Sequence, residues 1–459
     1  MQIDKTPIEK YNIPVPRYTS YPPANHFNDG MTGNAYFKLI EQSNADKPAN
    51  IAIYIHVPFC KKICFYCGCN ACTSKSEQVI QDYFSAMQVE LKEVFSRINK
   101  NRKISQVHYG GGTPNSVDIK YISAINQILF NEFSFIDNPE IAIECNPAYL
   151  DFEYLDALLQ LKFNRFSLGI QDFDNDVLRA VNRSPSVIPA DKIVSYLKKK
   201  NPGITVNLDF IYGLPGQSKK SFLSTITRAA RIKPDRLVTF SYAHVPWMKK
   251  HQEVLEKKNL PSSDEKMEMF LSARELLLAN GYVAVGLDHY VLPGDELNSA
   301  LKENNLHRNF QGYCTRRTTG QVYGFGVSAI SQLEKGYIQN VKQVDDYNRF
   351  LKGNRLPVEK GLVLNDEQKL IRDSITALMC NKYLDFLLIA RKHGFSLDEF
   401  KRITGFNKDE MEPLAKDGLL EYFEHGIKVS ETGGVFIRNI AALFDPAFKS
   451  MKNRYSNSV

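Results

Sequence analysis

The chain has 459 residues, 43% hydrophobic and 24% charged, close to the average for globular proteins, which excludes a disordered, collagen-like or coiled-coil chain. No stretch approaches the roughly 18 uncharged apolar residues of a membrane span, so we expect no membrane partner. The 58 basic and 51 acidic residues give a net charge of +7, spread over short lysine runs. No basic stripe is interleaved with aromatic residues, so we expect no nucleic-acid partner. The N-terminus lacks the apolar region of a secretory signal, which favours a cytoplasmic protein.

Residues 1–49 differ from the remainder of the chain. Prolines at positions 14, 16, 22 and 23 predict an extended stretch, because proline fixes φ and has no backbone N–H to donate. We expect residues 1–49 to form a strap over the active site of the domain that follows.

Between residues 50 and about 290, short apolar runs that predict strands alternate with longer amphipathic segments that predict helices. The predicted strands are Ile51–Val57, Ile104–Tyr109, Ile141–Cys145, Arg165–Ile170, Ile204–Tyr212 and Arg236–Tyr242. The predicted helices include Glu77–Ile98, Tyr149–Leu161, Ala190–Lys200, Lys219–Ala230 and Asp264–Asn280. This alternation indicates right-handed βαβ units around a parallel sheet. We therefore predict an α/β fold over residues 50–360, a partial (β/α)6 TIM-like barrel with its functional loops after the strand ends.

Five of the eight cysteines fall within thirteen residues, at positions 60, 64, 67, 69 and 72. A disulfide framework would spread its cysteines along a secreted chain, so this grouping indicates a metal site. Cys60, Cys64 and Cys67 can bind three irons of a 4Fe–4S cluster and leave the fourth iron open, whereas a ferredoxin normally closes all four. Structural zinc on Cys64-x-x-Cys67 and Cys69-x-x-Cys72 is the alternative. Zinc ribbons, however, separate their two pairs by about 12–20 residues, and here one residue lies between them.

The C-terminal part has a helical texture. Leu364–Asn381 predicts a helix opened by Asn365, and short turns at Gly394, Gly405 and Gly418 separate further helices. We expect a small helical or winged-helix-like domain over residues 361–459.

The cysteine loop, with Tyr66 before its third cysteine and the run Gly110–Pro114 about 40 residues later, resembles the radical SAM superfamily. Glycines after a strand let backbone amides approach a ligand closely. The resemblance implies that S-adenosylmethionine (SAM) binds the open iron through its amino and carboxylate groups. It also implies that one electron from the cluster cleaves SAM to methionine and a 5′-deoxyadenosyl radical.

Further stretches along almost the whole chain are similar to the family of oxygen-independent coproporphyrinogen III oxidases. They are Arg17–Pro22, Cys67–Asn70, Leu208–Pro215, His307–Tyr313 and Gly326–Ser331. The resemblance implies an enzyme of haem biosynthesis that oxidatively decarboxylates two propionates of coproporphyrinogen III to vinyl groups, giving protoporphyrinogen IX. The chain departs from the family pattern at Asn146, where an acidic residue is common, and at Cys314, where threonine is more frequent.

The resemblance also implies site residues. Those matching contacts to the cluster-bound SAM are Tyr54, Gly111, Glu144 and Ile330, and those matching contacts to a second SAM are Gly112, Thr113, Gln171, Arg183, Asp209 and Ala243, with Tyr66 beside them. We expect Cys69 and Tyr54 to act in catalysis, Cys69 without binding the cluster. Arg17 and Arg308 are our candidates for the substrate carboxylates, because arginine stays charged and pairs bidentately with carboxylates.

Two alternatives share the scaffold: a haem chaperone relative that is not an oxidase, and a radical SAM methyltransferase or anaerobic haem-degrading relative. The chain contains Arg17–Pro22 and His307–Tyr313, two stretches that the chaperone relatives typically lack. Their presence also argues against the second alternative, but less decisively. We expect an electron donor such as flavodoxin or ferredoxin, an electron acceptor that the sequence does not identify, and a monomer.

Overall fold

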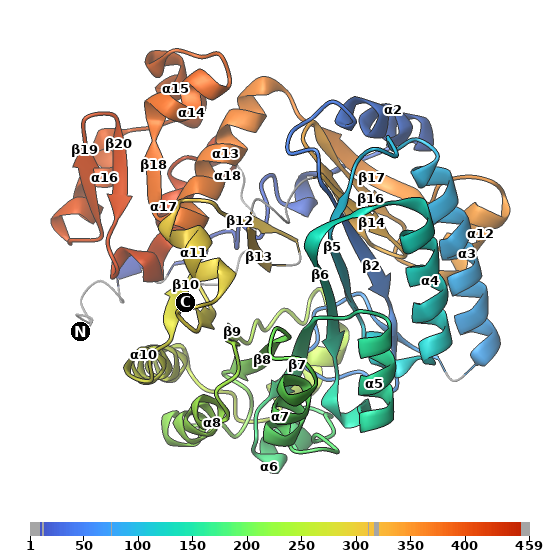
Figure 1. Cartoon of the computed structure of the whole chain (residues 1–459). Helices are drawn as coiled ribbons and strands as arrows, with labels where there is room; N and C mark the ends of the chain where they lie inside the picture. Colours follow the sequence, from blue (N-terminus) through green and yellow to red (C-terminus); the bar gives the residue numbers. More distant parts are fainter. Residues whose placement is uncertain (1–9, 12, 75, 311, 316–320, 451–459) are drawn as a thin grey trace.

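A curved sheet of thirteen strands forms the body of the protein in the computed structural model, which describes residues 10–11, 13–74, 76–310, 312–315 and 321–450 (Figure 1). The strand order is β1-β17-β16-β15-β14-β2-β5-β6-β7-β8-β9-β11-β10. The strands at its centre are β2 (Ile51–Val57), β5 (Ile104–Gly111), β6 (Phe135–Cys145), β7 (Arg165–Gln171), β8 (Thr205–Tyr212) and β9 (Arg236–Ser241). All six run parallel, as the sequence predicts for a partial (β/α)6 barrel.

Helices cover the outer face of these strands (Figure 1). They are α3 (Glu77–Phe95), α4 (Ile119–Glu132), α5 (Phe152–Gln160), α6 (Asn175–Ala180), α7 (Ala190–Lys200), α8 (Lys219–Ile232) and α10 (Ser263–Ala279). Side-chain caps explain where several of them begin, because each cap accepts a bond from an N–H that would otherwise lack a partner. Ser76, Asp151 and Ser262 cap α3, α5 and α10 in this way. Helices α4 and α6 are not among the helices named from the sequence.

The sheet continues past the parallel strands on both sides. β14 (Gln321–Phe325) pairs parallel with β2, and an antiparallel run follows it: β15 (Ile330–Leu333), β16 (Gly336–Asn340), β17 (Val358–Val363) and β1 (Asn28–Asp29). On the opposite side, β11 (His289–Val291) pairs antiparallel with β9, and β10 (Val283–Val285) pairs antiparallel with β11. These strands are not predicted from the sequence, because runs this short carry little periodic signal.

Smaller elements complete the barrel. They are α2 (Gly33–Ser43), α9 (Glu253–Glu256), α11 (Glu296–Lys302), α12 (Val344–Lys352), the paired strands β3 (Phe59–Cys60) and β4 (Cys72–Thr73), the hairpin β12 (Leu306–Asn309) and β13 (Gly312–Thr315), and the 3-10 turns η1 (Ala24–His26), η2 (Pro114–Ser116), η3 (Pro147–Tyr149) and η4 (Lys250–Gln252). Helix α2 lies in the stretch that the prolines predict to be extended, and it starts beyond the last of those prolines, capped by Thr32.

The C-terminal part combines helices with a three-stranded antiparallel sheet, β18-β20-β19. Its elements are α13 (Asp366–Asn381), β18 (Tyr383–Asp385), α14 (Phe386–Lys392), α15 (Leu397–Thr404), α16 (Lys408–Lys416), β19 (Leu420–Phe423), β20 (Gly426–Val429), η5 (Gly433–Phe436), α17 (Ile437–Ala442) and α18 (Pro446–Ser450). Asn365 accepts a hydrogen bond from the Gln368 amide at 2.8 Å, so it caps α13 as predicted. One continuous apolar core joins barrel residues such as Phe210 to C-terminal residues such as Phe436.

Hydrogen bonds tie the N-terminal strap to the C-terminal part, an arrangement that we call the terminal clasp. The Tyr18 and Tyr21 hydroxyls donate to the Asp445 carboxylate at 3.0 and 2.9 Å. The Arg438 guanidinium donates to the backbone oxygens of Val15 and Pro16. Asp445 is only 1% exposed, so these bonds are shielded from competing water. The clasp therefore holds the strap against the C-terminal part.

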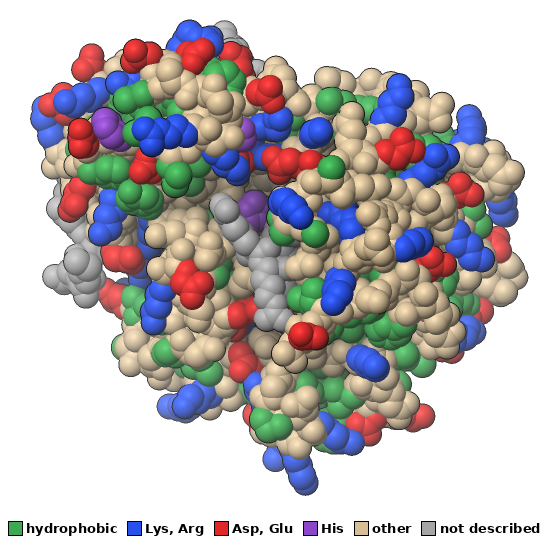
Figure 2. All heavy atoms as spheres, turned by 45° about the horizontal axis from the view of Figure 1, so that its top comes forward, with side chains coloured by type: hydrophobic (Ala, Val, Ile, Leu, Met, Phe, Trp, Pro, Cys, Tyr) green, Lys and Arg blue, Asp and Glu red, His purple; other side chains and the backbone are tan. Residues whose placement is uncertain are grey.

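Charged side chains of both signs are interspersed over the face shown in Figure 2, where the C-terminal part and the barrel meet. Such mixing is typical of a solvated surface. Among the residues that the structure describes, no helix has the length and apolar character required to cross a membrane.

We predict that Asp445→Ala lowers the free energy of unfolding by about 3 kcal/mol, because two buried hydroxyls lose a charged acceptor. Urea denaturation followed by circular dichroism measures the change. Asp398→Ala, at an exposed position in the first turn of α15, is the matched control and should cost below about 0.5 kcal/mol. Equal midpoints for the two variants would contradict the assigned role of the clasp.

Candidate active site

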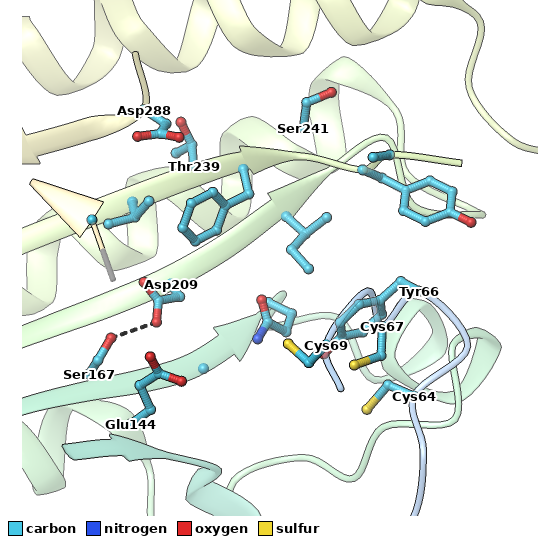
Figure 3. Close-up of a pocket in the computed structure, with 18 of the residues that line it drawn as sticks. Cys64, Tyr66, Cys67, Cys69, Glu144, Ser167, Asp209, Thr239, Ser241 and Asp288 are labelled. Carbon is cyan, nitrogen blue, oxygen red and sulfur yellow. Dashed lines mark hydrogen bonds between the residues drawn. The ribbon is translucent and has the colours of Figure 1, made fainter. Parts of the chain in front are cut away.

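A cavity of about 720 Å³ opens at the carboxyl ends of the parallel strands. The cysteine loop forms one end of it, with Cys64, Cys67 and Cys69 close together, and Glu144 and Asp209 project from strands β6 and β8, on either side of β7 (Figure 3). Asp288 and Ser241 lie on the facing wall. This is the edge at which α/β barrels place their functional groups.

The three cysteines predicted to bind a cluster all line this one cavity. The Cys60 sulfur lies 3.2 Å from the Thr113 hydroxyl, and an Arg183 N–H donates to the Cys64 sulfur at 3.6 Å. A hydrogen bond from Cys69 lowers the pKa of Cys67 to about 6, against the opposing effect of burial, so this thiol ionises readily. Thiolates are the form that binds iron. The donors therefore fit a cluster held by one cysteine on each of three irons.

The zinc alternative needs Cys72, which packs against the hydrophobic core and does not line the cavity. Within the described ranges, no three histidine, cysteine or acidic side chains converge as the ligands of one metal ion.

The glycine run lies against the segment that precedes Cys60. The Gly112 amide donates to the Val57 oxygen at 2.8 Å, and a Cβ at Gly112 would lie only 2.5 Å from the Pro58 oxygen. A side chain at this position would push the two loops apart. Glycine is therefore required where the run supports the cysteine loop.

Glu144 projects beside this run and is held by His108, whose Nε2 lies 2.9 Å from the carboxylate. Burial acts to raise the pKa of Glu144, but the bonds from His108 and the Gly111 amide outweigh it and keep the pKa below its ordinary value. A Cβ at Gly110 would lie 2.7 Å from the same carboxylate. Glu144 is therefore an ionised acceptor, suited to an ammonium or hydroxyl group.

Asp209 sits deeper in the cavity, where the Ser167 hydroxyl and an Asn207 N–H each donate to it at 2.7 Å (Figure 3). Burial raises the pKa of Asp209, and these two bonds oppose the rise. Gln171, at φ 70°, lies beside it on the cavity wall, and its Oε1 is buried without a hydrogen-bond partner among the described residues. Arg183 donates to the Gly169 oxygen. These groups offer acceptors and one cation to a polar ligand.

Both substrate candidates from the sequence, Arg17 and Arg308, line the other end of the cavity. Arg308 donates to the Tyr313 hydroxyl at 3.2 Å and stacks 4.7 Å from the centre of its ring. Its Nε is buried without a hydrogen-bond partner in the described part of the chain.

Two further cations, Lys266 and Arg438, line the same end, and the sequence analysis misses both. Burial, followed by the nearby charge of Arg17, lowers the pKa of Lys266 to about 8. Burial and the charges of Arg17 and Arg308 also lower the pKa of Arg438. No motif marks these residues, because each reaches the cavity from an element distant in sequence. We call Arg17, Lys266, Arg308 and Arg438 the cationic wall.

The remaining predicted residues fall into two groups. Tyr66, Gly111, Thr113 and Ala243 line the cavity, whereas Tyr54 and Ile330 lie outside its lining. The Tyr54 hydroxyl is 3.1 Å from His56 Nδ1, and His56 Nε2 is 2.9 Å from the Asn70 oxygen. Burial lowers the pKa of His56, which keeps the ring neutral. Nε2–H then donates to Asn70, and Nδ1 accepts from Tyr54.

The two departures from the family pattern have local structural roles. The Asn146 side chain accepts from the Ala148 amide at 3.1 Å and so caps η3, while Asn146 also lines the cavity. Cys314 pairs with His307 in the β12–β13 hairpin and is buried. Gln311, inside the predicted motif at this hairpin, lies outside the described residues.

Comparisons with known proteins agree with this arrangement. Residues 54–229 match the model of the radical SAM superfamily. The oxygen-independent coproporphyrinogen III oxidase of Synechocystis sp. is 35% identical over 98% of this chain and 97% of its own length. The enzyme of the same name from Escherichia coli is 36% identical over 95% and 94%. The solved structure of coproporphyrinogen III oxidase (HemN) from Escherichia coli superposes with a TM-score of 0.87, covering 97% of this chain and 100% of that one.

We predict that Cys60→Ala, Cys64→Ala or Cys67→Ala each leaves little iron bound after anaerobic reconstitution, since each change removes one of three thiolate ligands. Iron and sulfide analysis together with visible absorption measures the loss. Cys72→Ala is the matched control, because this thiol lies on the same segment outside the cavity lining. Full iron content in any of the three variants would refute the ligand assignment.

Proposed function

Since the chain belongs to the oxygen-independent coproporphyrinogen III oxidases of the radical SAM superfamily, we propose how its own residues serve that reaction. The enzyme oxidatively decarboxylates two propionate side chains of coproporphyrinogen III to vinyl groups and forms protoporphyrinogen IX in haem biosynthesis. It uses a 4Fe–4S cluster and SAM. The observation that carries the assignment is one cavity with a cysteine loop at one end and the cationic wall at the other.

The cluster position follows from the thiols. Cys60, Cys64 and Cys67 would hold it, and Thr113 and Arg183 would keep the first two sulfurs in place. When bound, the cluster and SAM supply the one-electron cleavage that yields the 5′-deoxyadenosyl radical. The residues around the thiols would bind SAM and hold the end of SAM that forms the radical inside the cavity.

For the SAM bound at the cluster we propose Tyr54, Gly111, Glu144 and Ile330. Glu144 is ionised and would accept from the amino group of SAM. The neutral His56 ring accepts from Tyr54, so this tyrosine is fixed in orientation even though it lies behind the cavity lining.

A second group of residues is suited to the second SAM inferred from the family resemblance: Tyr66, Gly112, Thr113, Gln171, Arg183, Asp209 and Ala243. Asp209 and the unpartnered Gln171 Oε1 would accept hydrogen bonds from amino or hydroxyl groups. Arg183, beside them, would receive a carboxylate.

The cationic wall is our proposed site for the substrate carboxylates. Arg17 and Arg308 are joined there by Lys266 and Arg438, and Asp288 is the acidic side chain nearest to them on the wall. Coproporphyrinogen III carries four propionates, so it would supply the negative charge that this wall lacks. Binding through some propionates would orient another toward the cysteine loop.

Cys69 is the proposed catalytic thiol. It lines the cavity two residues beyond Cys67, and its hydrogen bond to Cys67, together with burial, raises its pKa, so it carries a proton at neutral pH. A protonated thiol beside the substrate can give up a proton or a hydrogen atom. The family reaction removes hydrogen from the propionate carbon next to the macrocycle, after which carbon dioxide and one electron leave.

We further propose that the enzyme is a cytoplasmic monomer that receives electrons from a small carrier such as flavodoxin or ferredoxin and passes substrate electrons to a separate acceptor. All eight cysteines are free thiols, and a reducing compartment suits them. Incubating the reconstituted protein anaerobically with dithionite, SAM and coproporphyrinogen III tests the function directly. Chromatography should detect protoporphyrinogen IX, and its absence with an intact cluster would refute the assignment.

We predict that Lys266→Gln and Arg438→Gln each raise the apparent KM for coproporphyrinogen III about tenfold or more, since a charge-assisted bond contributes about 1.5–3 kcal/mol. Cleavage of SAM without substrate should stay near the wild-type rate. Lys401→Gln, on an exposed position of α15, is the control. An unchanged KM in both variants would show that Lys266 and Arg438 stabilise the fold and do not bind substrate.

The pH dependence of KM follows from Lys266. At pH 7 its ammonium is charged, and because its pKa is about 8, raising the pH through 8 removes the charge and weakens carboxylate binding. We therefore predict that KM rises above pH 8. Lys266→Arg should keep a low KM to higher pH, because a guanidinium stays protonated. Identical pH profiles would rule out Lys266 as the titrating group.

We predict that Cys69→Ser reconstitutes a normal cluster and binds SAM, yet converts coproporphyrinogen III poorly. Iron and sulfide content and the amount of vinyl product are the two measurements. Cys72→Ser should keep both at wild-type values. Iron loss in Cys69→Ser would make Cys69 a ligand, and full turnover would make it a packing residue.

A further inference from the structure

The segment of residues 247–258, which contains η4 and α9, covers the outside of the cysteine loop. The Lys249 ammonium donates to the Cys69 oxygen at 2.8 Å, and His251 Nε2 lies 2.7 Å from the Cys67 oxygen. Gln252 donates to the Tyr66 oxygen at 3.1 Å. We call residues 247–258 the cover segment. Three of its residues, Lys249, His251 and Gln252, contact the backbone of the cysteine loop.

The outer side of the cover segment is unusually apolar for an exposed surface. Trp247 is 58% exposed, Met248 72% and Val254 42%, and Trp247 is the only tryptophan of the chain. Aromatic residues and methionine are enriched where proteins meet partners. A group of three large exposed apolar side chains within eight residues therefore indicates an interaction surface.

Exposed lysines accompany these apolar side chains. Lys250 and Lys257 are exposed on the cover segment itself, and Lys61, which directly follows Cys60, is exposed on the cysteine loop. The acidic side chains of the segment are Glu253 and Glu256, and Glu256 is engaged by His244 at 3.3 Å. The balance of charge is positive, so the surface complements an acidic partner.

We propose that the cover segment is the docking surface for an acidic protein that carries a one-electron centre. Each cleavage of SAM consumes one electron, which a reduced carrier must deliver to the cluster while the carrier itself is oxidised. A carrier seated on Trp247 and Met248 would be separated from the loop of Cys67 by the cover segment alone. The inference rests on the electron-donor partner proposed above.

The alternative role for this surface is closure of the substrate opening, since Trp247 also contributes to the cavity lining. Met248, Lys250 and Lys257 do not line the cavity, and their side chains belong to the outer surface alone. Changes at the two lysines therefore probe the partner without altering the substrate pocket.

The test is the double variant Lys250→Glu/Lys257→Glu, with Lys401→Glu on α15 as the matched control. The probes are a bacterial flavodoxin and an acidic 2Fe–2S ferredoxin, each immobilised for interferometry with the full chain in solution. Wild-type affinity for at least one probe should fall as salt is added, because exposed charges are screened. We expect the double variant to bind that probe at least tenfold more weakly and the control to bind normally.

Turnover separates this inference from the proposed function. The double variant should lose activity driven by the reduced protein probe and keep activity driven by dithionite, with unchanged iron content. Equal binding by wild type and double variant, or no binding of either probe to the wild type, would overturn the docking surface. Equal loss with dithionite would instead assign the segment to the active site. Failure of the wild type with dithionite would refute the function itself.

Discussion

Parallel hydrogen bonding from β2 through β9 is the constraint on which the whole site depends. The register pairs Tyr54 with His108, Glu144 with Ser167, and Gly169 with Asp209. Residues separated by tens of positions in sequence therefore meet at one edge of the sheet. A slip of one residue in any strand would turn its polar side chains toward the covering helices and its apolar ones into the cavity. The buried apolar residues of the strands permit a single register. They thus determine indirectly which polar side chains face the cavity.

The parallel core could be predicted closely because short apolar runs typical of strands alternate along the chain with amphipathic segments typical of helices. Strand β2 and helix α7 have the bounds that the sequence indicates, and β7 differs by a single residue. Strand β6 begins six residues earlier than predicted, since Asp137, Asn138 and Pro139 interrupt the apolar pattern without ending the strand. The antiparallel strands after β14 and β9 depend on tertiary pairing, which short runs of sequence do not reveal.

The cysteine loop could be recognised because its residues are adjacent in the chain. The cationic wall could be predicted only in part: Arg17 and Arg308 lie in stretches that resemble the family, whereas Lys266 and Arg438 lie in none. Arg17, Lys266, Arg308 and Arg438 come from the strap, helix α10, the β12–β13 hairpin and helix α17. Only folding brings the four together, and in the sequence Lys266 and Arg438 each resemble an ordinary surface cation. On the proposal that these cations bind the substrate propionates, their mutual repulsion is a cost to folding that a bound polyanion would offset. Binding should therefore stabilise this end of the molecule most.

The terminal clasp also fixes the order in which the molecule can be completed. Asp445 and Arg438, which hold the strap, are made long after the cysteine loop, and at about 5–20 residues per second the interval is on the order of tens of seconds. During this interval the strap lacks the partners that Asp445 and Arg438 later provide. The N-terminal strap is therefore among the last parts of the fold to be fixed in place.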